Sequence, residues 1–167
     1  MPSPEDYLSA LKALAPRAGL PARMSANIPQ EQLDQFPPDW GVIEQLAAYA
    51  FALPEVVERP TQIAPDGSRA LHLADGVPAN REAFLVGREF AHIHNPPIGS
   101  MHAMLPEPFR GLAIDQGWVV RHPFAIRGSG PQGAVFIYAP RDAGELEWAK
   151  LLLAIAHAWA CGRLSAN

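Results

Sequence analysis

Apolar residues in the first third of the chain recur at helical spacing. Residues 3–14 carry one apolar stripe, and residues 39–53 carry a second, with Asp39 placed to cap the start of the helix. The stretch between them, 20–38, is rich in proline and shows little periodicity. The pattern predicts a helical N-terminal extension over residues 1–53.

From residue 54 onward the spacing of apolar residues changes to two, which is typical of β-strands. Helical spacing returns at residues 106–117 and again at residues 142–160. The segments with strand character are 56–63, 69–73, 88–94, 100–105, 118–122 and 134–138. We therefore predict an α+β fold, in which an antiparallel β-sheet has helices packed on one face.

The last predicted helix is apolar around most of its circumference. One stripe runs from Leu146 to Ala160, and Trp148 and Trp159 belong to a second. A helix of this kind is either enclosed in the core or used for association. Both alternatives stay open, and the second predicts a homodimer formed through this helix.

Two of the predicted strands form a β-hairpin around a loop of proline and glycine at residues 95–99. Strict alternation places Phe90, His92, His94 and His102 on one face, with His92 opposite His102. Three imidazoles would then converge on one small patch. Glu89 alternates to the opposite, apolar face, so we expect it to be less involved in binding.

Composition restricts the class of protein. The 167 residues are 49% hydrophobic and 18% charged, and the net charge of −4 without any basic run argues against nucleic-acid binding. The single Cys161 excludes an internal disulfide, and the polar N-terminus does not resemble a signal peptide. No apolar run approaches the roughly 18 residues that span a membrane. We expect a cytoplasmic, single-domain protein over residues 1–167, with its core at 54–162.

The histidine patch has two chemical interpretations. Imidazole with a pKa near its usual value of about 6.5 is a suitable general base at neutral pH. Neutral imidazole is also the commonest metal ligand, so His92, His94 and His102 could hold a divalent metal such as Fe, Mn, Ni or Zn. His122 could act as a fourth ligand, as the base, or only as the end of a strand before Pro123. The remaining alternative is that these histidines form only a solvated polar face, with no catalytic or metal-binding role.

Several motifs in one order resemble the fungal luciferase family and its short bacterial relatives. They are Arg88-Glu89-x-Ala91-His92-x-His94, then His102, then Gly117-Trp118-x-x-Arg121-His122-Pro123, then Tyr138-Ala139-Pro140-Arg141. The resemblance covers roughly residues 86–162 and extends more loosely over 54–85.

The resemblance implies an enzyme that adds O2 to a hydroxy-pyrone, giving a peroxide that loses CO2. Such a reaction needs a base to remove an acidic enol proton. His92, His94, His102 and His122 are then the catalytic candidates. Arg88 or Arg121 would hold the anionic oxygens, because guanidinium is always charged, and Trp118 would stack on a flat ring.

Two functions from different classes therefore remain. One is an oxygenase-type enzyme that acts with O2 on a small, flat, acidic aromatic or pyrone compound. The other is a non-catalytic protein that binds a metal or a small ligand through the same histidines. We expect no organic cofactor in either case.

Overall fold

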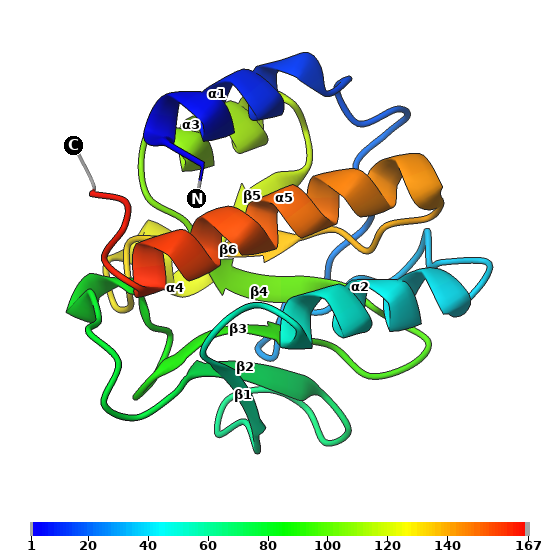
Figure 1. Ribbon diagram of the computed structural model, residues 1–167. Coiled ribbons are helices and arrows are strands. Elements are labelled where there is room, and N and C mark those ends of the chain that lie inside the picture. Colours follow the sequence, from blue (N-terminus) through cyan, green and yellow to red (C-terminus); the bar gives the residue numbers. More distant parts are fainter. Residues whose placement is uncertain (1, 166–167) are drawn as a thin grey trace.

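The computed structural model describes residues 2–165 (Figure 1). Within them, one antiparallel sheet has the strand order β1-β2-β3-β4-β6-β5. The strands are β1 (Val56–Arg59), β2 (Arg69–Leu73), β3 (Glu89–Ile93), β4 (Met101–Met104), β5 (Val119–Arg121) and β6 (Ala134–Ile137). The predicted hairpin is confirmed as β3 and β4, with His92 paired to His102.

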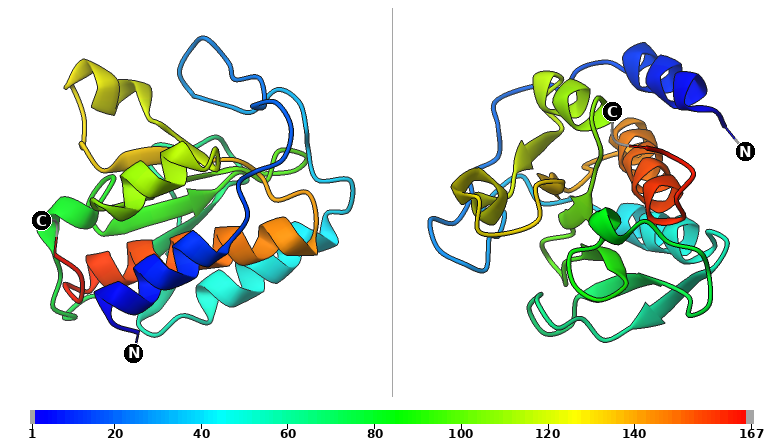
Figure 2. Two further views of the ribbon diagram at one scale, coloured as in Figure 1. Left: turned by 90° about the horizontal axis from the view of Figure 1, so that it is seen from above. Right: turned by 90° about the vertical axis from the view of Figure 1, so that its left-hand side faces the viewer.

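The helices confirm the α+β prediction. They are α1 (Pro4–Ala13), α2 (Gly41–Phe51), α3 (Phe109–Asp115), α4 (Pro123–Arg127) and α5 (Ala143–Ala160), and a 3-10 turn, η1, spans Arg81–Ala83. Figure 2 shows α1, α2 and α5 side by side on one face of the sheet, while α4 lies by the other face. The predicted layer of helices on one face is thus observed, and α4, which the periodicity did not predict, lies by the other face. No helix in the described part of the chain is long and apolar enough to cross a membrane.

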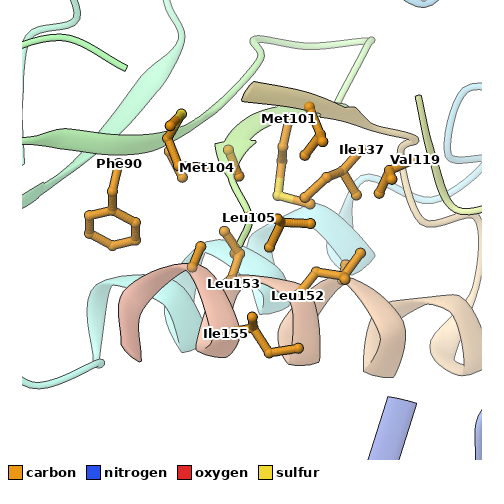
Figure 3. Close-up of a cluster of buried hydrophobic side chains, with 14 of the residues drawn as sticks. Phe90, Met101, Met104, Leu105, Val119, Ile137, Leu152, Leu153 and Ile155 are labelled. Carbon is orange, nitrogen blue, oxygen red and sulfur yellow. The ribbon is translucent and has the colours of Figure 1, made fainter. Parts of the chain in front are cut away.

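Helix α5 is enclosed in the core. Its inner residues Leu152, Leu153 and Ile155 pack under the sheet against strand residues such as Met101 and Ile137 (Figure 3). Each such side chain contributes about 1.5–3 kcal/mol when fully buried. Because α1 and α2 also contact α5, the apolar circumference of this helix is used within the chain. The homodimer stays a prediction, and α5 presents no uncovered apolar face that supports it.

A β-bulge in β3 changes which side chains face each side of the sheet. The register between β2 and β3 shifts by one residue, so that Phe90 has no partner across the ladder. Phe90 turns toward α5, where its ring centroid lies 6.0 Å from that of His157 (Figure 3). Glu89 consequently shares a face with His92. The faces that strict alternation predicts for Phe90 and Glu89 are wrong for this reason.

The N-terminal extension is helical only at its two ends. Between α1 and α2 the chain crosses to the face of the sheet opposite α5 (Figure 2). Gln32 anchors this crossing segment, because its Oε1 accepts a hydrogen bond of 3.0 Å from the Ala139 amide. The Arg17 guanidinium donates to Gln35 Oε1 over 2.7 Å. The segment is thereby tied to the end of β6.

Some boundaries differ from the predicted ones. Strand β1 ends at Arg59, because Pro60 has no N–H for the ladder. Helix α2 begins after Trp40, and Asp39 instead accepts a hydrogen bond from the Gly41 amide. Helix α4 was not predicted, since its five residues are too few to show a helical period.

The tip of the β3–β4 hairpin packs closely on α2 at Gly99. Gly99 has a φ of +70°, and a Cβ there would lie 2.7 Å from Ile43 Cδ1. We expect Gly99→Ala to lower the free energy of unfolding by about 3 kcal/mol, from backbone strain plus overpacking. Gly76→Ala is the matched control: its φ is +80° but nothing lies within 4 Å, so backbone strain of about 1 kcal/mol remains. Urea unfolding measures the free energy of unfolding of both variants. Equal losses in Gly99→Ala and Gly76→Ala would contradict the close packing of Gly99 on α2.

Candidate functional site

A cavity of about 140 Å³ opens on the face of the sheet opposite α5. Its floor consists of imidazoles from two central strands, His92 and His94 from β3 and His102 from β4, together with His122 at the start of α4. The remaining wall is mostly apolar and includes Ile28, Pro29, Ile63, Pro65, Leu85 and Phe124. The structure therefore brings all four predicted histidines to one cavity.

His92, His94 and His102 form a nearly equilateral triangle. Their ring centroids are 5.2, 5.1 and 5.0 Å apart, and one ring nitrogen from each lies within 4.8 Å of the others. All three side chains are buried. They are buried because β2 and β6 flank the hairpin and the crossing segment lies over it.

Each of these histidines also contacts an oxygen. His92 Nδ1 lies 2.7 Å from Glu89 Oε1, and His94 Nδ1 lies 2.9 Å from Ser100 Oγ. His102 Nε2 makes a longer contact of 3.4 Å with Gln30 Oε1. Between the rings, His92 Nε2 and His102 Nδ1 are 3.0 Å apart.

Glu89 is a site residue that the period-two pattern misplaced. It is fully buried, and besides His92 it accepts a hydrogen bond of 3.2 Å from the Thr61 hydroxyl. His72 Nε2 lies 3.6 Å from its second oxygen. A buried carboxylate needs such partners, since an unpartnered charge is very costly. Glu89 belongs to the support of the histidine floor.

Gln30 and Ser100 were also missed. Ser100 follows the hairpin loop, and its position beside His94 depends on the turn geometry. Gln30 is 72 residues from His102 in sequence and reaches the site through the crossing segment. No local signal in the sequence marks either residue as part of the site.

His122 stands at the rim of the cluster, with its ring centroid 4.8 Å from that of His102. It caps helix α4, where its Nδ1 accepts a hydrogen bond of 3.1 Å from the Phe124 amide. A neutral imidazole whose Nδ1 accepts carries its proton on Nε2. His122 therefore presents an N–H donor, and the predicted proximity to the patch holds.

Burial keeps most of the cluster uncharged. Burial, with a smaller contribution from the neighbouring His92, lowers the pKa of His94 to about 3. The pKa of His102 falls well below its usual value because of burial and then the neighbouring histidines. Burial also lowers the pKa of His122. At neutral pH these three imidazoles are neutral; His94 and His102 each carry a lone pair that can bind a metal or a proton, whereas the lone pair of His122 accepts the Phe124 amide.

The predicted substrate-binding residue Arg88 lies outside this cavity. Its guanidinium donates to three backbone carbonyls, those of Leu73, Ala74 and Val77, over 2.8–2.9 Å. These bonds tie the loop after β2 to the start of β3. The geometry gives Arg88 a positioning role and does not support direct contact with a ligand in the cavity.

Trp118 and Arg121 are also directed elsewhere. Trp118 stacks on Trp148 of α5 with ring centroids 4.5 Å apart, on the helix-covered side. Arg121 donates to the Ala125 carbonyl and to Gln132 Oε1. The position of neither side chain supports the predicted contact with substrate.

The buried neutral histidines make stability depend on pH. Above about pH 6.5, His94 is neutral in both the folded and the unfolded chain. Between about 6.5 and about 3, only the unfolded chain binds the proton, so His94 lowers the free energy of unfolding as pH falls, by up to about 1.4 kcal/mol per pH unit. We expect His94→Gln to flatten this slope between pH 4 and 6. Urea unfolding with a chelator present measures the free energy of unfolding of both proteins at each pH, relative to its value at pH 7.5. If the variant and the wild-type protein show the same pH dependence, His94 is not buried in its neutral form.

Comparison with known proteins matches the segment that carries the site. Residues 87–156 match the Luciferase domain. Two proteins named luciferase, from Armillaria gallica and Armillaria ostoyae, are each 28% identical to this chain over 160 residues. The alignment covers 86% of this chain and 59% of each relative, so the chain spans about three fifths of their length. No solved structure matches the chain.

The match and the geometry agree on one region. The matched residues include β3 and β4 with their three histidines, the cap residue His122, and most of α5. The resemblance predicted over residues 86–162 is confirmed by this match. Residues 87–156 therefore match the Luciferase domain, and the chain is similar to two fungal luciferases over 86% of its length.

Proposed function

We propose that this chain is an oxygenase-type enzyme that acts with O2 on a small, flat, acidic aromatic or pyrone compound. The observation that carries the proposal is the floor of buried imidazoles opposite an apolar wall in a single cavity. Such a cavity suits a ligand with one polar edge and two apolar faces. The relatives named luciferase favour oxygen chemistry over simple binding.

The size of the cavity limits the substrate. At about 140 Å³ it is close to the roughly 150 Å³ that accommodates benzene in a protein core. One six-membered ring fits inside with its hydroxyl group toward the histidines. A substituent on that ring would extend past the partly exposed apolar side chains Ile28, Ile63 and Phe124. We therefore propose single-ring compounds and ring compounds with one extended arm.

The residues of the floor divide the chemistry between them. His122 presents an N–H that can donate to a substrate oxygen. His92, whose Nδ1 contacts the Glu89 carboxylate, takes the acidic proton of the substrate, which leaves an electron-rich enolate or phenolate. Carbon of that anion adds O2, and the outer oxygen takes up a proton, so that substrate and O2 give a hydroperoxide with no other reactant.

A non-catalytic binding protein is the second candidate. It is favoured by the oxygen partners of the three buried histidines, because a ligand-binding site also needs its side chains held in place. The two candidates differ in one measurable respect: only the enzyme consumes O2.

Oxygen uptake by the full chain, with light output recorded in parallel, tests the proposal. The compounds are a single-ring hydroxy-pyrone and a pyrone with an extended arm like that of 3-hydroxyhispidin. We expect uptake by the wild-type protein and a loss of at least 100-fold in His102→Ala, because the variant lacks a floor imidazole. The matched control is His157→Gln: His157 lies on α5 and bonds the Pro54 carbonyl, so uptake should be retained.

Circular dichroism of each variant controls for folding. Equal uptake by the wild-type protein and a folded His102→Ala variant would refute the catalytic assignment. Ligand binding without uptake for every compound would favour the binding protein instead.

A further inference from the structure

We propose that His92, His94 and His102 form a three-histidine site for a divalent first-row transition cation, with an open coordination position facing the cavity. The inference rests on the proposed function and changes one part of it: with an ion bound, the lone pairs of these three imidazoles are occupied, so the ion, as a Lewis acid, would acidify the substrate hydroxyl in place of an imidazole base. Its evidence is the geometry of the three side chains, and it can be tested by metal uptake without any substrate.

The ring spacing is that of three imidazoles around one ion. Zinc binds imidazole nitrogen at about 2.0–2.1 Å, so neighbouring nitrogens are about 2.8–3.0 Å apart in an octahedral site and about 3.3–3.4 Å apart in a tetrahedral one. His92 Nε2 and His102 Nδ1 are 3.0 Å apart, which matches the octahedral spacing. The centroid separations of 5.0–5.2 Å are equal for the three rings, as expected when all three are equidistant from a common point.

The nitrogens that point away from this centre are all partnered. Metal-binding histidines generally donate their second N–H to a carboxylate, a carbonyl or another oxygen, which fixes the orientation of the ring. Here Glu89, Ser100 and the Gln30 side-chain carbonyl occupy those three positions. The carboxylate partner of His92 also strengthens that ring as a donor.

This arrangement places lone pairs of His92 and His102 face to face and leaves one on His94 nearby, since one ring nitrogen from each residue lies within 4.8 Å of the others. If each outer nitrogen carries the proton that its oxygen partner accepts, then each inner nitrogen carries a lone pair. Two facing lone pairs 3.0 Å apart repel unless a proton or a cation lies between the rings. One proton can relieve the contact between His92 and His102, but His94 would still lack a partner for its inner nitrogen. One cation relieves all three.

The ligand set indicates the class of metal. Imidazole nitrogens suit Zn²⁺, Cu²⁺, Fe²⁺, Co²⁺ and Ni²⁺ and are poor ligands for Mg²⁺ and Ca²⁺. Three protein ligands with a fourth position open are typical of catalytic sites. His122 directs an N–H donor at the cavity, so it is placed to contact a molecule bound at the open position instead of the ion.

Metal titration of the full, untagged chain tests the site. The protein is stripped with a chelator and then titrated with Zn²⁺ and Co²⁺ in a calorimeter. We expect one equivalent to bind, with affinity reduced at least 100-fold in His94→Gln and 10- to 100-fold in Ser100→Ala. His157→Gln is the matched control and should bind like the wild-type protein. Proton NMR of the wild-type protein is a readout that does not depend on variants, since only the resonances of the three ligands should shift directly on Zn²⁺ binding.

Absence of saturable uptake by the wild-type protein would overturn the proposal, and so would an unchanged affinity in a folded His94→Gln variant. The outcome is separable from that for the proposed enzyme. If the chelator-stripped protein consumes O2 but shows no saturable binding of Zn²⁺ or Co²⁺, the metal site is overturned and the enzyme is not. Stoichiometric metal without oxygen uptake would refute the enzyme alone.

Discussion

The contact between the buried Glu89 carboxylate and His92 Nδ1, 2.7 Å long, is the interaction on which the arrangement of the cavity depends. It can form only because the β-bulge at Phe90 moves Glu89 to the histidine face of β3. An ionised carboxylate accepts hydrogen bonds and never donates them, so this contact places a proton on Nδ1 of His92. The other nitrogen of His92 then faces His102. One irregularity in a strand thus determines the chemistry of two imidazoles.

The same two strands serve both stability and function. On one face, β3 and β4 pack apolar side chains such as Phe90 and Met101 against α5 (Figure 3). On the other face they hold the histidines, which are costly to bury unless they are partnered. Central strands with neighbours on both sides cannot shift without breaking the ladder, so the imidazoles are held more rigidly than loop residues would be. The apolar face therefore stabilises the structure that the polar face needs.

The sequence predicted the features that depend on local periodicity. The hairpin and its register at His92 and His102 follow from spacing alone, whereas the spacing left two alternatives for the last helix, enclosure or association. The role of Glu89 did not, because a bulge changes the parity of a strand without leaving a mark in the hydrophobic pattern. Trp118 was expected beside a ligand from its residue type, yet it stacks on Trp148 of α5, a contact that only tertiary structure decides. The contact of Gln30 with His102 could not be predicted, because the crossing segment has no hydrophobic periodicity from which its position could be inferred.

The floor and the wall of the cavity come from different parts of the chain. All four histidines lie within the matched residues 87–156, so the chemistry of the floor belongs to the Luciferase domain. Much of the wall, including Ile28, Gln30 and Ile63, comes from segments that precede that domain. The crossing segment is held against the sheet by Gln32, whose Oε1 accepts the Ala139 amide just after β6. Relatives that share the floor but differ before residue 87 would then present the same imidazoles to differently shaped ligands. The shape of the cavity in this chain therefore depends partly on residues that precede the matched segment.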